Sequence, residues 1–139
     1  MILLDTDHIS VLQRQSSVGE RLANRLDGCG DLPATSVITL EEQSRSWIAE
    51  LGRRRDVADQ VVPYRSLLDM FAFFEEWEIL PFSFDAVSVF KSMRANRVRI
   101  ATTDLKIASI AITSGLVLLT ANSRDFERVP GLQFDNWIS

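Results

Sequence analysis

Two short apolar runs that contain no charged residue constrain the fold more than any other feature of this sequence. They are residues 2–4, which end at Asp5, and residues 116–119, which a polar stretch follows. Runs this short and this apolar are typical of strands that helices cover on both faces. Because helical periodicity fills the chain between them, we expect an α/β fold with a mostly parallel central sheet.

The remaining apolar patterns predict the other elements of a three-layer α/β/α sandwich. Helices are expected over 17–27, from Thr39 to about residue 55, within 56–77 with a break at Pro63, over 87–94, and over 104–114 before Gly115. Further strands are expected over 34–38, 79–82 and 132–134. A chain of 139 residues is long enough for one buried core. We therefore expect a single domain over 1–139.

The composition limits which cellular compartment and which kinds of metal site we expect. One cysteine, Cys29, has no partner for an internal disulfide, and one histidine, His8, adds too few ligands for a structural zinc site. The first residues have neither a basic flank nor a cleavage site, and no apolar run approaches the roughly 18 residues of a membrane span. These features favour a cytoplasmic protein without a membrane partner.

The net charge of −4 argues against nucleic-acid binding, which usually needs a basic surface. The argument weakens if several acids are held at one cation, because the remaining charges would then balance. The question is therefore where the acids lie.

Four acids fall at or just after the ends of predicted strands. Asp5 ends the first strand, Glu42 follows the second, Asp104 opens a helix, and Asp125 lies beyond the strand that ends at Leu119. In a parallel sheet these positions meet at one edge. Carboxylates without histidine or thiolate partners suit a hard cation such as Mg²⁺ or Mn²⁺.

Each acid also has a simpler interpretation. Thr39 to Glu42 fits a capping box, in which the Glu reaches back to the Thr39 amide. Asp104 suits the dipole at a helix N-terminus, and Asp125 suits a cap. His8 is expected to form local hydrogen bonds at the start of a helix. Asp5 is hardest to explain this way, because a carboxylate beside a buried strand is costly without a partner.

Four segments in this order resemble the motifs of PIN-domain ribonucleases. The segments are Leu-Leu-Asp-Thr-Asp at 3–7, Ser-Val-Ile-Thr-Leu-Glu-Glu at 36–42, Asp-Leu-Lys-Ile-Ala at 104–108 and Leu-Thr-Ala-Asn-Ser-Arg-Asp-Phe at 119–126. The last segment and the tail that follows are similar to the VapC toxins of toxin–antitoxin pairs. Asp7 departs from the pattern, since the family usually has Asn there, and the glycine often found before the third motif is absent.

The resemblance implies a Mg²⁺-dependent endoribonuclease that a cognate antitoxin protein silences. Asp5 and Asp104 would be the main metal ligands, Glu42 would complete the site, and Asp125 would bind a second metal. Thr6, Thr120 and Asn122 would support them through hydrogen bonds. A water that the cation activates would attack the RNA phosphodiester.

We also expect surfaces for partners. Five basic side chains around the rim are candidates for RNA phosphates: Arg45, Arg94, Arg97, Arg99 and Lys106. The helix over 18–26 and the one over 47–51 are expected to form an apolar groove for the antitoxin. The aromatic segment 67–77 is expected to form a homodimer interface.

Two other classes of protein remain open from the sequence. A phosphatase of the aspartate-nucleophile type would use Asp5 as nucleophile and Asp7 as general acid, although no later lysine and paired-aspartate motif is found. A binding module with a degenerate PIN-like site would keep the fold without catalysis, but the presence of all four acids counts against it.

Overall fold

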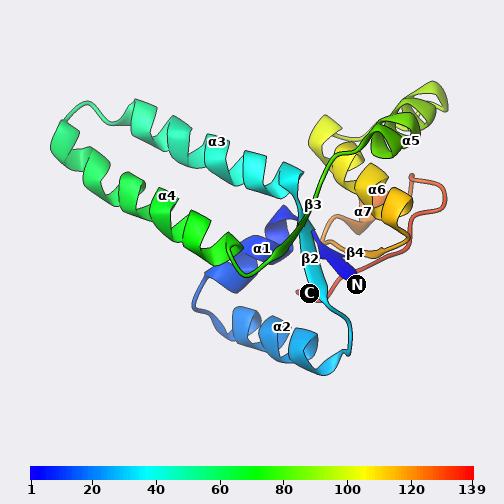
Figure 1. Ribbon diagram of the computed structural model, residues 1–139, viewed down its shortest axis with the longest axis horizontal. Coiled ribbons are helices and arrows are strands. Elements are labelled where there is room, and N and C mark those ends of the chain that lie inside the picture. The colour runs from blue at the N-terminus through cyan, green and yellow to red at the C-terminus, as the bar shows by residue number, and fades with distance from the viewer.

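The computed structural model describes residues 1–139 and contains one five-stranded sheet with the order β3-β2-β1-β4-β5, in which every neighbouring pair is parallel (Figure 1). In chain order the elements are β1 (Ile2–Leu4), α1 (Thr6–Gln13), α2 (Ser17–Gly28), β2 (Pro33–Ser36), α3 (Val37–Arg53), the 3₁₀ turn η1 (Val57–Gln60), α4 (Val61–Phe74), β3 (Glu78–Leu80), α5 (Phe84–Ala95), α6 (Thr102–Ser114), β4 (Val117–Leu119), α7 (Ser123–Phe126) and β5 (Phe134–Asp135).

The alternating side chains of the central strands divide the core into two halves. Leu3 and Leu118 pack on one face with residues of α5, α6 and α7, including the fully buried Phe126. Leu4 and Leu119 point to the other face, where α1, α2 and α4 cover them. Because the central strands β2, β1 and β4 are short and covered on both faces, they contain no charged residue. The expected three-layer α/β/α sandwich is confirmed, with a sheet that is wholly parallel.

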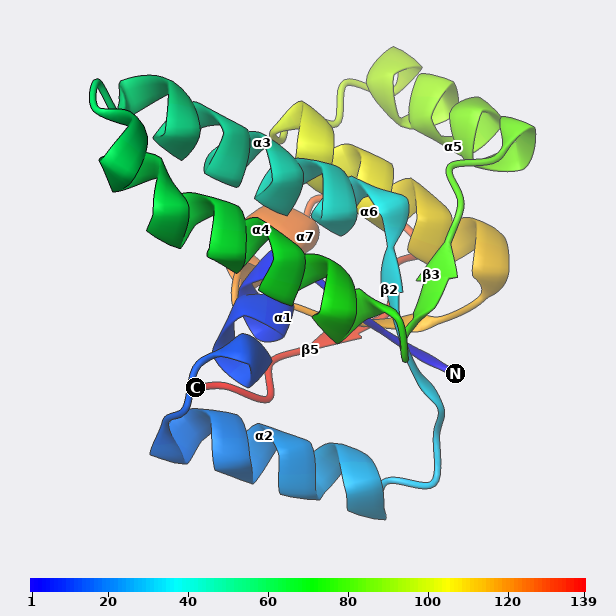
Figure 2. The same cartoon turned by 60° about the vertical axis from the view of Figure 1, so that its left-hand side comes forward.

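Helices α3 and α4 form an antiparallel pair that extends away from the sheet (Figures 1 and 2). Only the sheet-proximal parts of the pair reach the core, through Leu40 and Trp47 of α3 and Met70 and Phe74 of α4. The distal half carries exposed apolar residues instead, including Ile48, Val57 and Val62.

Most expected elements are present, although their boundaries differ by one to three residues, and two of the differences have a clear local reason. Strand β2 ends at Ser36 rather than Ile38, because the Ser36 hydroxyl accepts a hydrogen bond from the Thr39 N–H and begins α3 at Val37. Pro63 does not break a helix over 56–77. It is the third residue of α4, in the first turn, where a missing N–H costs nothing.

Two further expectations concern the ends of helices. The 104–114 helix begins two residues earlier, at Thr102, and ends as expected at Gly115, whose φ of 65° is the left-handed conformation that glycine adopts easily. None of the helices is both long enough and apolar enough to cross a membrane.

Candidate functional site

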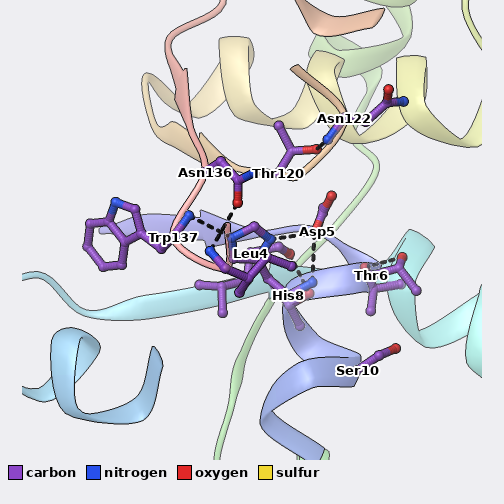
Figure 3. A network of polar contacts seen from close by, with 12 residues as sticks. Leu4, Asp5, Thr6, His8, Ser10, Thr120, Asn122, Asn136 and Trp137 are labelled. Atoms are coloured by element: carbon purple, nitrogen blue, oxygen red, sulfur yellow. Dashed lines mark hydrogen bonds and ion pairs between the residues drawn. The ribbon is translucent and has the colours of Figure 1, made fainter. Parts of the chain in front are cut away.

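Asp5 leaves the central strand at the carboxyl edge of the sheet. Its N–H donates to the Leu119 carbonyl at 3.0 Å, which continues the β1–β4 pairing by one residue. Its side chain then caps α1, since Oδ1 accepts from the His8 N–H at 2.9 Å and faces His8 Nδ1 at 3.1 Å (Figure 3). These contacts compensate for the desolvation free energy of burying this carboxylate beside β1.

Glu42 is held by Thr6, which is itself held by Thr39. The Thr6 hydroxyl donates to Glu42 Oε1 at 2.7 Å and lies 3.0 Å from the Thr39 hydroxyl. Because the single proton of Thr6 is used on Glu42, the hydroxyl of Thr39 donates to Thr6. Glu42 thus has a fixed direction, and Thr39 contributes a contact that the sequence did not indicate.

The capping box expected at Thr39–Glu42 is wrong. Ser36 caps α3, and Glu42 is the sixth residue of the helix, too far along to reach a free N–H of the first turn. The Thr39 N–H is already bonded to Ser36. Glu42 therefore has no capping role, and its only hydrogen bond in the chain is the one that it accepts from the Thr6 hydroxyl.

Asn122 joins the other two acids. Its side-chain NH₂ donates to Asp104 Oδ2 at 3.3 Å and to Asp125 Oδ2 at 2.9 Å. Its own N–H donates to the hydroxyl of the buried Thr120, which directly follows β4. Through these hydrogen bonds Asn122 connects Asp104 of α6 with Asp125 of α7, and Thr120 holds the backbone of Asn122.

Electrostatic coupling links all four acids, Asp5, Glu42, Asp104 and Asp125, which we call the acidic cluster. Burial raises the pKa of Asp104 from 3.8 to about 6, and the charges of Glu42, Asp5 and Asp125 push it in the same direction. The hydrogen bond from Asn122 acts against them. Charges shift a pKa this way only over a short range, so the other three acids lie in the neighbourhood of Asp104.

The donor set of the acidic cluster consists of carboxylate oxygens, which fits Mg²⁺ or Mn²⁺. The mutual repulsion that raises the pKa of Asp104 is what a cation would relieve. No three His, Cys, Asp or Glu side chains are close enough here to form a complete metal site. Binding a cation would therefore require some of these carboxylates to turn, and the Asn122 amide lies between Asp104 and Asp125.

The basic side chains near the site divide into engaged and free groups. Arg94 donates to the carbonyls of Val98 and Ile100 and to the Thr102 hydroxyl, so it holds the segment that leads into α6. Arg45 pairs with Glu41 within α3. Arg97 and Arg99 are exposed and have no partner within the chain, which leaves them as the better candidates for phosphate contacts.

The prediction that α2 forms one wall of an antitoxin groove is wrong. Leu22 and Leu26 of α2 are buried against the sheet and offer no exposed apolar face. Trp47 of α3 instead lines an open cavity of about 300 Å³ between α1, α3 and α4. The other residues that line it are Gln13, Ser66, Asp69, Met70 and Phe73.

The phosphatase interpretation gains nothing from this geometry. Asp7 lies in the first turn of α1 and is exposed, and no hydrogen bond joins it to Asp5. The oxygen Oδ1 of Asp5 already accepts two hydrogen bonds from His8.

A five-stranded parallel sheet between helices agrees with the PIN-like fold expected from the four motifs. Comparison with known proteins gives a more specific likeness. The chain is 41% identical over 59 residues to ribonuclease VapC1 of Rickettsia felis and 33% identical over 81 residues to the tRNA(fMet)-specific endonuclease VapC of Salmonella typhimurium. These matches cover 40% and 55% of this chain, and only 44% and 61% of the two relatives.

A solved structure extends the likeness over the whole chain. The DNA-bound VapBC complex of Salmonella typhimurium contains a chain that is 26% identical, with a TM-score of 0.76 and 99% of each chain covered. No family model matches the chain. The resemblance to VapC-type PIN-domain proteins, inferred from the four motifs, is confirmed by these comparisons.

Proposed function

We propose that this protein is a metal-dependent endoribonuclease and the toxin of a toxin–antitoxin pair. The observation that carries the proposal is the acidic cluster, whose members come from four separate segments. Burial raises the pKa of Asp104 to about 6, and the charges of the other three acids add to this effect. A structural role does not require such crowding of like charges, whereas active sites often do. The VapC names of the relatives support the same reaction.

In this proposal each residue of the site has a distinct task. Asp5, Asp104, Glu42 and Asp125 hold one or two Mg²⁺ or Mn²⁺ ions, and Thr6 keeps Glu42 in place. A bound cation supplies an activated water and neutralises charge on the phosphodiester. Asn122 links Asp104 and Asp125 through its side-chain amide. Arg97 and Arg99, just before α6, contact RNA phosphates.

The proposed antitoxin covers the cavity between α1, α3 and α4. The cavity is open and partly apolar, with Trp47, Met70 and Phe73 in its wall. An apolar side chain of a bound segment fits such a surface. Support comes from the neighbouring solved structure, which is a VapBC complex. Expressed without a partner, the wild type should arrest growth, and Asp5→Asn should not.

The direct test is RNA cleavage by purified, partner-free protein. We expect a structured RNA to be cut in Mg²⁺ or Mn²⁺ and to stay intact in EDTA. Asp5→Asn and Asp104→Asn should each slow cleavage at least about tenfold, the scale of one lost transition-state interaction. Asp85→Asn is the matched control, because Asp85 is an exposed acid in the first turn of α5, away from the cluster.

The ends of the products test the chemistry separately. Attack by water leaves a 5′-phosphate and a 3′-hydroxyl, whereas attack by the ribose 2′-hydroxyl leaves a 2′,3′-cyclic phosphate. Cleavage that persists in EDTA, or cyclic ends, would overturn the metal-dependent mechanism. Cleavage that survives both aspartate substitutions would remove the acidic cluster from the reaction.

A further inference from the structure

His8 is the only histidine of the chain, and its side chain is completely buried between the site and the residues after β5 (Figure 3). On one side, Nδ1 lies 3.1 Å from Asp5 Oδ1. On the other side, Nε2 lies 3.2 Å from the backbone nitrogen of Trp137. One imidazole therefore links an acid of the cluster to a segment 129 residues away in the sequence.

The two contacts together determine where the ring carries its proton. A backbone N–H can only donate, so Nε2 accepts the hydrogen bond from Trp137. A neutral imidazole then has its proton on Nδ1, which donates it to Asp5 Oδ1. The Trp137 backbone thus selects the tautomer that Asp5 needs.

The segment that provides this N–H is itself fixed in place. We call residues 136–138, which follow β5, the strap. The Asn136 N–H donates to Asp135 Oδ1, and the Ile138 N–H donates to Asn136 Oδ1. The Trp137 indole donates to Asp135 Oδ2 and lies under the Arg25 guanidinium, 4.1 Å from the ring centre. The strap therefore presents the Trp137 N–H in a defined direction.

The effect on Asp5 is to leave one oxygen free. Oδ1 accepts both the backbone N–H and the ring N–H of His8, so the rotation of the carboxylate is restricted. Oδ2 has no partner within the chain and is not buried, because no buried side-chain oxygen in the structure lacks a partner. Oδ2 is the oxygen left to bind a ligand.

We propose that His8 is a positioning residue, which the strap holds as the Nδ1–H tautomer and which fixes the Asp5 carboxylate so that Oδ2 faces a bound cation. The proposal rests on the proposed metal-dependent function. Hydrogen bonds to ligating groups from such supporting residues are commonly worth tenfold to a hundredfold in metal affinity or activity, roughly.

The first test uses metal-free protein and needs no activity. Because the chain has one histidine, a two-bond ¹H–¹⁵N spectrum of the imidazole gives one set of ring signals. We expect a protonated Nδ1 and an unprotonated Nε2. Trp137→Pro removes the backbone donor along with the indole, whereas Trp137→Ala removes the indole alone. Only the proline variant should lose the tautomer preference.

The second test measures Mn²⁺ affinity by electron paramagnetic resonance at a temperature where all variants are folded. His8→Leu removes both ring contacts and should weaken Mn²⁺ binding roughly tenfold. His8→Asn places an amide nitrogen where Nδ1 lies and should retain part of the affinity. A high Mg²⁺ concentration should restore RNA cleavage by His8→Leu, because its defect lies in cation binding.

The outcomes separate this proposal from the proposed function. Wild-type affinity for Mn²⁺ in His8→Leu, or a wild-type ring protonated at Nε2, would overturn the role of His8. A wild type that neither binds Mn²⁺ nor cleaves RNA would overturn the proposed function. It would also overturn the role of His8 in positioning Asp5 for a cation. A purely structural His8 would lower the melting temperature and leave the Mn²⁺ affinity of the folded variants unchanged.

Discussion

Asp104 is the acid at which the crowding of charge has its clearest thermodynamic consequence. Burial and the charges of Glu42 and Asp5 raise its pKa from 3.8 to about 6. Between these values the folded protein holds a proton that the unfolded chain releases. This contribution to stability is therefore complete below pH 3.8 and is lost as the pH rises through about 6.

We expect the Asp104→Asn variant not to show this loss of stability with rising pH, because its amide does not titrate. In EDTA, its melting temperature should rise relative to the wild type as the pH increases from about 4 to above 6, and the difference should then level off. Added Mg²⁺ at neutral pH should favour the wild type instead, because only the wild type keeps the full ligand set. Thermal unfolding in both buffers measures the effect, and a pH-independent difference in EDTA would contradict it.

Glu42 gives a second prediction at the same scale. Because Ser36 caps α3, Glu42→Gln should leave the stability of metal-free protein unchanged or higher, since one repelling charge is removed. Its stabilisation by Mg²⁺ should shrink, and RNA cleavage should fall at least about tenfold. Thermal unfolding with and without Mg²⁺ and a cleavage assay provide the two readouts.

Glu41→Gln is the control for this change. Glu41 precedes Glu42 in the chain but pairs with Arg45 along the outside of α3. It should therefore keep the wild-type response to Mg²⁺. Equal losses in the two variants would mean that Glu42 acts only through the general charge of the helix.

Asp5, Asp104 and Asp125 could be placed from the sequence because each caps a helix or lies in its first turn, whereas Glu42 lies further along α3 than expected. The contacts of the four acids could not be predicted, because these depend on side chains from other segments. Nothing near Glu42 indicates that Thr6 donates to it across 36 positions, and nothing near His8 points to Trp137. The spacing of three from Asp5 to His8, typical of a helix cap, was the one available signal.

At the scale of elements, Arg94 connects α5 to the segment that leads into α6. Its guanidinium donates to two backbone carbonyls and to the Thr102 hydroxyl, and it lies over the Phe90 ring. Since α6 carries Asp104, this side chain helps to set where that acid lies. The sequence suggested a phosphate contact because a basic side chain near the site supports either role.

We expect Arg94→Lys to lower the free energy of unfolding by about 1 to 3 kcal/mol, because lysine cannot reproduce several hydrogen bonds in one plane. Denaturant unfolding measures this loss. Arg97→Lys is the control, since Arg97 has no partner within the chain and keeps its charge in the variant. If Arg94→Lys were as stable as the control and only RNA binding fell, Arg94 would be a phosphate ligand after all.

The boundaries of elements were predicted less well than their existence. Ser36 both ends β2 and caps α3. The predicted strand, which continued to Ile38, was therefore two residues too long at this end. A proline inside an apolar periodic segment marks a helix start as readily as a break, and Pro63 marks the start of α4.

At the scale of the whole molecule, the protruding α3–α4 pair exposes a stripe of large apolar side chains along α4. Tyr64, Leu68 and Phe71 follow one another at helical spacing and are 54%, 71% and 51% exposed. Phe74, Phe73 and Trp77 of the same aromatic segment belong to the core side instead. The homodimer predicted from residues 67–77 would therefore use the outer stripe.

We expect sedimentation at a concentration on the order of 10 µM to give a dimer, and Leu68→Glu to give a monomer with an unchanged melting temperature. Leu68 is exposed, so its replacement leaves the core intact. Phe84→Glu is the control, because Phe84 is 91% exposed on α5 and lies outside the stripe. A wild-type monomer at this concentration would reject the dimer.

The position of β1 in the sheet has a consequence for a chain that is still being synthesised. Ile2 pairs with Val117, and the strap contacts His8, so β1 and α1 are completed by segments that are synthesised much later. A nascent chain that stops before α6 has Asp5 and Glu42 but neither Asp104 nor Asp125. Such long-range pairing delays folding until its partners have emerged. A ribosome-bound fragment of this kind therefore lacks two members of the acidic cluster, which is complete only after α7 has been synthesised.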